Sequence, residues 1–286
     1  MERRDLGPPG PKQGRILLIF FLAALIFSGP VELPAGRAPL EMDIKPGVSP
    51  AQVKYLNTAV NDVFRFFMEN YHINLHKTML LIAAPDEQAY ASALMKEFKL
   101  PGPKAKEEAN RTGGMARESK DHYILALKAR ASDSMASILN VTCHEMVHWY
   151  QLREGGQEKT GQHGWIMEGV ANTIALHIVE GRLPGEFNKF RQKCLATLKK
   201  AKTIPSFEKL DSRKDWHVAM DQHGGHVIYA KATVAVMELA QRAGIKSLFD
   251  YYRHLKHQTP AKAFRMAFKV NLKEFEKEMD QKFSKS

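Results

Sequence analysis

The stretch "TCHEMVHWYQLREGGQEKTGQHGWIMEGVANTIALH", residues 142–177, decides the fold of the middle of this chain and points to its chemistry. It predicts two helices separated by a polar loop rich in glycine, the second helix ending at Gly181. On the first helix, His144 and His148 are four residues apart and therefore share one face. Two imidazoles placed in this way can reach one metal ion.

Two glutamates accompany the histidines. Glu145 lies beside them on the same helix, where it cannot easily be a third ligand but can take a proton from an attacking water. Glu168 stands between "WIM" and "GVA", where an unpaired buried carboxylate would be costly and a metal ligand would be compensated. Catalytic zinc sites have three protein ligands and one open position. The pattern predicts one catalytic Zn²⁺ held by His144, His148 and Glu168; the competing interpretation is a histidine-rich helix that matches by chance.

The flanking sequence predicts an α+β fold, with a small mixed or antiparallel sheet that carries the zinc-binding helices and a mostly helical part after it. We expect one domain over residues 36–286, divided into an α/β part (36–182) and a helical part (183–286). The expected elements are a linker over 29–50, a helix capped by Ser49, a strand over 78–84, a helix over 85–98, a loop over 100–114, a hairpin from "GMARES" and "HYILAL", and a helix capped by Ser132 or Asp133.

The first residues are typical of an export signal. Basic residues precede the uninterrupted apolar run "ILLIFFLAALIF", residues 16–27, which is shorter than the about 20 residues of a membrane span. We therefore expect residues 1–35 to be a signal peptide or signal anchor with its linker. The protein would be periplasmic or secreted, or held at the membrane by residues 16–28 if the segment is not cleaved.

Charge and cysteine content narrow the range of partners. The net charge is +11, and residues 1–35 hold four Lys/Arg and three Asp/Glu, so the remainder carries +10. This positive charge is compatible with association of the protein with a membrane or cell-wall surface, or it serves solubility alone. The sequence contains no block of Lys and Arg interleaved with aromatic residues, so we do not expect it to bind nucleic acid. Cys143 and Cys194 lack metal-knuckle spacing, and we expect two free core cysteines. The oligomeric state is left open.

The motifs "CHEMVHWYQ" and "WIMEGVA" resemble the H-E-x-x-H and W-x-x-E-G-x-A motifs of gluzincin metallopeptidases, the thermolysin-like and aminopeptidase-like superfamily, and in particular its compact bacterial peptidase MA-like members. The resemblance is specific over residues 143–172 and covers 50–285 in outline. It implies His144, His148 and Glu168 as zinc ligands and Glu145 as general base. It also implies that "GGMARESKDHYILAL" contains an edge strand along which a peptide substrate pairs, or else a plain surface hairpin.

The resemblance also implies a donor for the developing oxyanion. One position departs from the family pattern. Tyr229 matches the tyrosine whose hydroxyl points at the metal in that family, although an aromatic at a helix start also serves packing. His223 and His226 are alternatives for this role. Asn172 stands four residues after Glu168, where thermolysin-type enzymes have an acidic residue, so the imidazole it contacts should be less basic.

These observations predict a zinc peptidase that hydrolyses peptide bonds of a peptide or protein substrate, with endopeptidase activity weakly favoured over aminopeptidase activity. Two alternatives remain. One is a zinc-containing binding module of the cell envelope without proteolytic activity. The other is a helical, anchor-bound structural protein without a metal site.

Overall fold

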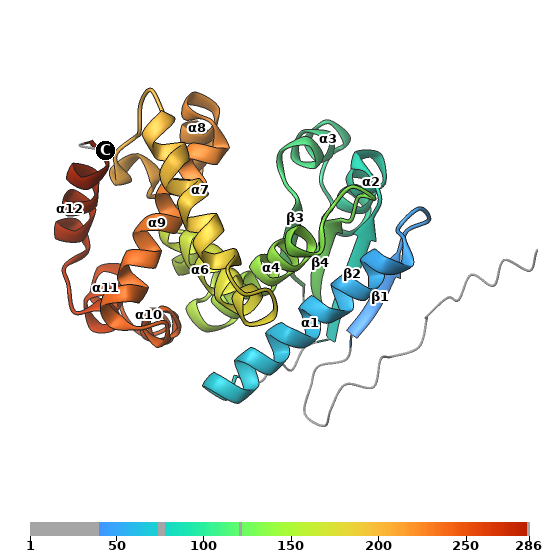
Figure 1. The fold of residues 1–286 in the computed structure, drawn as a ribbon, viewed down its shortest axis with the longest axis horizontal. Coiled ribbons are helices and arrows are strands. Elements are labelled where there is room, and N and C mark those ends of the chain that lie inside the picture. The colour runs from blue at the N-terminus through green and yellow to red at the C-terminus, as the bar shows by residue number, and fades with distance from the viewer. Residues whose placement is uncertain (1–39, 74–77, 120–121, 285–286) are drawn as a thin grey trace, which may run out of the picture.

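The computed structural model describes residues 40–73, 78–119 and 122–284 (Figure 1). The expected signal or anchor segment, residues 1–35, lies outside the described residues. Among the helices within the described ranges, none combines the length and apolar content that crossing a membrane requires.

A four-stranded sheet forms the first part of the fold, in the order β1-β2-β4-β3. β1 pairs with β2 and β2 with β4 in parallel, whereas β3 and β4 form the expected antiparallel hairpin. The sheet is therefore mixed, and the α+β prediction is confirmed. The elements of this part are β1 (Leu40–Ile44), α1 (Pro50–Tyr71), β2 (Thr78–Ala84), α2 (Glu87–Glu97), α3 (Gly102–Arg111), β3 (Gly114–Glu118) and β4 (His122–Lys128).

Strand alternation places helices on both faces of this sheet. Met79 and Leu81 of β2 belong to the large core that contains the buried side of α1, while Ile82 and Ala84 pack in a second core with α2 and α3. The large core continues without a break to Phe283 near the C-terminus. One hydrophobic core therefore joins the sheet to the helices that follow it.

Helices make up the remainder, which lies to the left of the sheet in Figure 1 with α4 between the two parts. Ser49 caps α1 as expected and forms a capping box with Gln52, and α2 begins after the cap Asp86. The later elements are α4 (Met135–Gly155), α5 (Gln157–Thr160), α6 (Gly164–Arg182), α7 (Glu186–Lys200), a 3-10 turn η1 (Phe207–Leu210), α8 (Arg213–His223), α9 (Gly225–Ala243), α10 (Lys246–Leu255), α11 (Pro260–Phe268) and α12 (Leu272–Ser284).

Three local predictions were wrong. The expected loop over 100–114 contains α3, because Pro101 precedes the helix and Pro103 lies in its first turn, where a missing N–H costs no intrahelical bond. The expected linker over 29–50 contains β1, whose short apolar alternation becomes stable only by pairing with β2. The cap of α4 is Ser134 rather than Ser132 or Asp133, since its side chain accepts from the backbone N–H of Ser137.

Candidate metal centre

Two packed helices, α4 and α6, bring the histidines and Glu168 together. The residue after this glutamate, Gly169, lets α6 approach α9 closely: a Cβ at this position would lie 2.6 Å from the carbonyl oxygen of Ala232. The glycine of "WIMEGVA" is therefore required by packing at this crossing.

The three expected ligand atoms converge. The Nε2 atoms of His144 and His148 are 3.0 Å apart, and they lie 3.3 Å and 3.6 Å from Oε2 of Glu168. For metal–ligand bonds of about 2.0–2.1 Å, tetrahedral geometry separates ligand atoms by about 3.3 Å. The donor set and its spacing therefore fit one zinc ion.

Two neutral amides orient the imidazoles. Nδ1 of His144 lies 2.8 Å from Oδ1 of Asn172, and Nδ1 of His148 lies 2.6 Å from Oε1 of Gln151. The amide nitrogen of Asn172 donates to Oγ1 of Thr233, and that of Gln151 donates to the carbonyl of Met167, so the amide oxygens face the histidines. Each Nδ1 therefore carries the proton, and both Nε2 lone pairs point into the site.

The same arrangement gives one carboxylate oxygen of Glu168 no hydrogen-bond donor. Its Oε2 is buried and makes no hydrogen bond. Two imidazole lone pairs and a carboxylate oxygen thus face each other with no positive group between them, which is unfavourable unless a cation is present. This is the observation by which the site fits a divalent metal ion best.

The pKa values of His148 and Glu168 without metal also show that this site favours positive charge. Burial lowers the pKa of His148, but the Glu168 carboxylate outweighs it and raises the pKa to about 9. Burial alone would raise the pKa of Glu168, yet the neighbouring His148 and His144 bring it well below its ordinary value. Without metal, a proton on the imidazole supplies part of the missing charge.

Glu145 lies against the edge strand of the sheet. A Cβ at Gly114 of β3 would lie 2.8 Å from Cγ of Glu145, so glycine is needed for α4 to pack here. The glutamate is buried, and its backbone carbonyl accepts from the hydroxyl of Tyr123. Burial raises the pKa of Glu145, and the two histidines partly offset the effect. A carboxylate with a raised pKa beside a metal site is suited to accept a proton.

Tyr229 enters the site from the start of α9. Its ring centroid is 6.5 Å from that of His144, and Trp216 packs edge-on against it at 5.1 Å. Burial and the Glu168 carboxylate raise the pKa of Tyr229 well above its ordinary value, so the hydroxyl keeps its proton and can donate. The structure does not bring His223 or His226 to this place: the former pairs with Thr203 and the latter is exposed.

A cleft of about 360 Å³ opens onto these groups. One wall is formed by β3 and the residues before it, from Gly113 to Ala116, and β3 is the edge strand of the sheet. The opposite wall is α8, with Arg213 and His217. Sequence reasoning missed both of these residues and Gln151. Only Gln151, three residues after His148 on the same helix, had a signal in its spacing.

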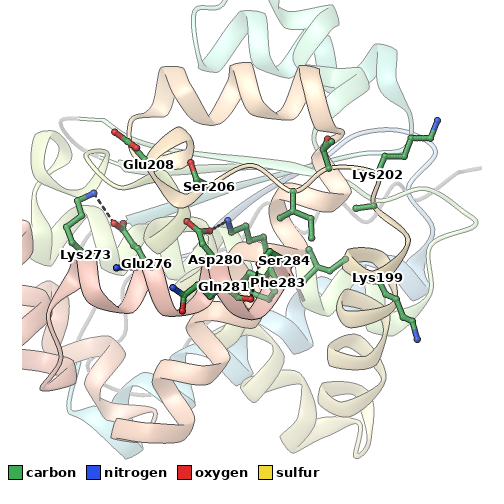
Figure 2. Close-up of a pocket in the computed structure, with 16 residues that line it drawn as sticks. Lys199, Lys202, Ser206, Glu208, Lys273, Glu276, Asp280, Gln281, Phe283 and Ser284 are labelled. Carbon is green, nitrogen blue, oxygen red and sulfur yellow. Dashed lines mark hydrogen bonds and ion pairs between the residues drawn. The ribbon is translucent and has the colours of Figure 1, made fainter. Parts of the chain in front are cut away.

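A larger cavity, about 850 Å³, lies away from this centre between α12 and the chain after α7. Figure 2 shows Lys273 paired with Glu276 in this cavity. Asp280 pairs with the buried Lys231. Lys231 also donates to the carbonyl of Pro205 and lies over the ring of Phe207. These pairs tie α12 to the rest of the helical part.

Comparison with family models and with curated proteins finds no match to this chain. The likeness to gluzincins therefore rests on the motif residues alone. Cys143 and Cys194 are both buried and free, and burial raises the pKa of the Cys143 thiol. The expectation of two core cysteines is confirmed, and neither takes part in the site.

Proposed function

We propose that this protein is a zinc-dependent peptidase of the gluzincin type. The observation that carries the proposal is the convergence of three possible ligand atoms, the Nε2 atoms of His144 and His148 and the buried Oε2 of Glu168, for which no hydrogen-bond donor is found. His144, His148 and Glu168 would hold the ion. Bound there, zinc supplies Lewis acidity, which polarises a substrate carbonyl and makes water more acidic.

The remaining steps belong to side chains of this chain. Glu145 accepts a proton from the water that adds to the peptide carbonyl, and delivers it to the amine that leaves as the C–N bond breaks. Tyr229 keeps its hydroxyl proton and donates to the oxygen that gains charge. Asn172 and Gln151 hold the imidazoles in the tautomer that the ligand role requires.

The form of the cleft favours a peptide as substrate. β3 pairs with β4 along one side, and among the described residues no strand pairs with its other side. Part of this strand lines the cleft next to Glu145. An extended peptide could pair with the backbone of Gly114–Ala116 at the outer edge of β3 and present a carbonyl to the proposed metal centre.

The test compares the purified protein with Glu145→Gln and His148→Ala. We expect about one zinc per chain in the wild type and in Glu145→Gln, and a loss in His148→Ala. Hydrolysis of a peptide library should fall by about 10²–10⁴-fold in Glu145→Gln. Zinc without turnover of any peptide would favour a binding module instead, and no zinc in any variant would leave a helical structural protein.

A further inference from the structure

The wall of the cleft opposite β3 has a charged side chain that the proposed reaction does not use. Arg213, His217 and Met220 recur at helical spacing along α8, and all three line the cleft together with Trp216. One face of α8 is therefore turned toward the place that a substrate would occupy. Arg213 is the residue on this face that lies at the start of the helix.

The charges around the cleft are otherwise paired. Glu108 lies 3.3 Å from Nζ of Lys104, and Arg111 contacts the carboxylates of Glu107 and Asp221 at 2.8 Å and 3.0 Å. Glu145 and Glu168 belong to the metal centre, where a divalent ion would balance them. Among the Asp, Glu, Lys and Arg side chains that line the cleft, this leaves Arg213, which has no carboxylate partner in the described part of the chain.

The charge of Arg213 acts on groups deep in the cleft. Burial lowers the pKa of His217, and the positive charge of Arg213 lowers it further. The same guanidinium opposes the rise in the pKa of Tyr229. The positive charge of Arg213 therefore also acts on a substrate bound beside Tyr229. The other charged side chains that line the cleft have partners of their own.

We propose that the cleft selects peptides that carry a carboxylate close to the bond being cut, and that Arg213 binds this group. The inference rests on the proposed peptidase function. A guanidinium can grip a carboxylate with two parallel hydrogen bonds, which gives orientation as well as charge. The carboxylate can belong to an aspartate or glutamate side chain or to a free C-terminus. The overall positive charge of the chain, +11, favours the approach of the same acidic substrates.

The test uses fluorescein-labelled peptide pools that differ in one feature. One pair has glutamate or glutamine at a fixed position, with an amidated C-terminus; the other pair has glutamine there and a free or amidated C-terminus. Binding to the zinc-loaded Glu145→Gln protein is measured by anisotropy, and cleavage by the wild type is measured in parallel. We expect the carboxylate form of at least one pair to bind about tenfold more tightly. The pair that shows the preference identifies the source of the carboxylate.

Charge reversal at two positions separates the local effect from the overall charge. Arg213→Glu should abolish the preference for the carboxylate or reverse it, and Arg213→Ala should reduce it to about twofold or less. Arg265→Glu is the matched control, because Arg265 is exposed on α11, outside the cleft lining, and the change in net charge is the same. The preference should survive in this control.

Two results would overturn the inference. One is equal binding of both members in both pairs, and the other is an equal loss of preference in Arg213→Glu and Arg265→Glu. Failure of the peptidase proposal looks different. In that case no peptide is cleaved, while the dependence of binding on Arg213 can still be observed with the Glu145→Gln protein.

Discussion

Among the described residues, two groups of histidine and carboxylate side chains have the composition of a metal site, and one of them lacks a lysine or arginine partner. The first is the central cluster of His144, His148 and Glu168; the second, called the α12 cluster here, consists of His163, Asp211 and Glu276. In each, the ligand atoms lie within 4.8 Å of one another. Composition and proximity therefore do not distinguish them.

The partners of the carboxylates do distinguish the two clusters. In the α12 cluster, Nζ of Lys273 lies 2.9 Å from Glu276 and 3.3 Å from Asp211. Trp165 donates to the other oxygen of Glu276, and His163 lies 2.8 Å from Asp211. The cation that this cluster requires is thus supplied by the protein itself. The central cluster has no lysine or arginine partner among the described residues, so its positive charge has to come from a proton on an imidazole or from a metal ion.

The largest expected effect is the loss of zinc from the central cluster. His148→Ala removes a ligand and should lower zinc affinity by more than the about 10–100-fold that follows the loss of an outer partner. His163→Ala changes the α12 cluster in the same way and should leave the zinc content unchanged. Elemental analysis and competition with a chelator measure both variants. An equal loss of zinc in both variants would mean that the two clusters do not differ in metal binding.

The amide that orients His144 should have the next largest effect. Asn172→Ala removes the acceptor at Nδ1, and we expect zinc affinity to fall by about 10–100-fold. Asn172→Asp keeps an acceptor in the same place and adds charge, so zinc should bind at least as tightly as in the wild type. Chelator competition measures the dissociation constants. Equal affinities in the alanine variant and the wild type would show that Asn172 does not position the ligand.

Removal of the Lys273 ammonium group is the corresponding test of the α12 cluster. Lys273→Met leaves the buried Glu276 without its ion-pair partner and should lower the free energy of unfolding by about 1–3 kcal/mol. Lys277→Met, on the exposed side of the same helix, is the control and should change it by less than about 0.5 kcal/mol. Urea unfolding measures both variants. Similar values for the two would mean that Lys273 contributes nothing beyond a surface charge.

Much of the fold and the principal site residues could be predicted from local signals. Ser49 and Pro50 mark the start of α1, the apolar run over 78–84 is β2, and the hairpin of β3 and β4 lies where it was expected. The spacing of His144 and His148 needs only helix geometry. These features depend on residues within a few positions of one another, which is why one sequence is enough to predict them.

The rest depends on contacts between distant segments. β1 becomes a strand through its pairing with β2, and Arg213 reaches the cleft because α8 folds back over it. The neutralisation of the α12 cluster requires Lys273 to meet Asp211, which lies 62 residues earlier in the chain. No local pattern encodes that meeting. The sequence could therefore suggest a metal site but could not tell a balanced cluster from an unbalanced one.

The smallest expected effect concerns the pH dependence of the α12 cluster. Burial raises the pKa of Asp211, but His163 and Lys273 outweigh it and lower the pKa below the ordinary value. A lowered pKa in the folded state stabilises the fold above the pKa of the unfolded state, about 3.9 for Asp. This stabilisation is lost as the pH falls through the lower, folded-state pKa.

Asp211→Asn removes this titration, and its unfolding free energy should lie on the order of 1 kcal/mol below that of the wild type near pH 5. The difference should shrink as the pH falls from about 4 toward 2, because the wild-type carboxylate then becomes protonated and loses its attraction to Lys273. Urea unfolding of both proteins across this range measures the difference. A gap that stays constant with pH would show that Asp211 acts through shape and hydrogen bonding, and that charge balance is not what distinguishes the α12 cluster from the metal centre.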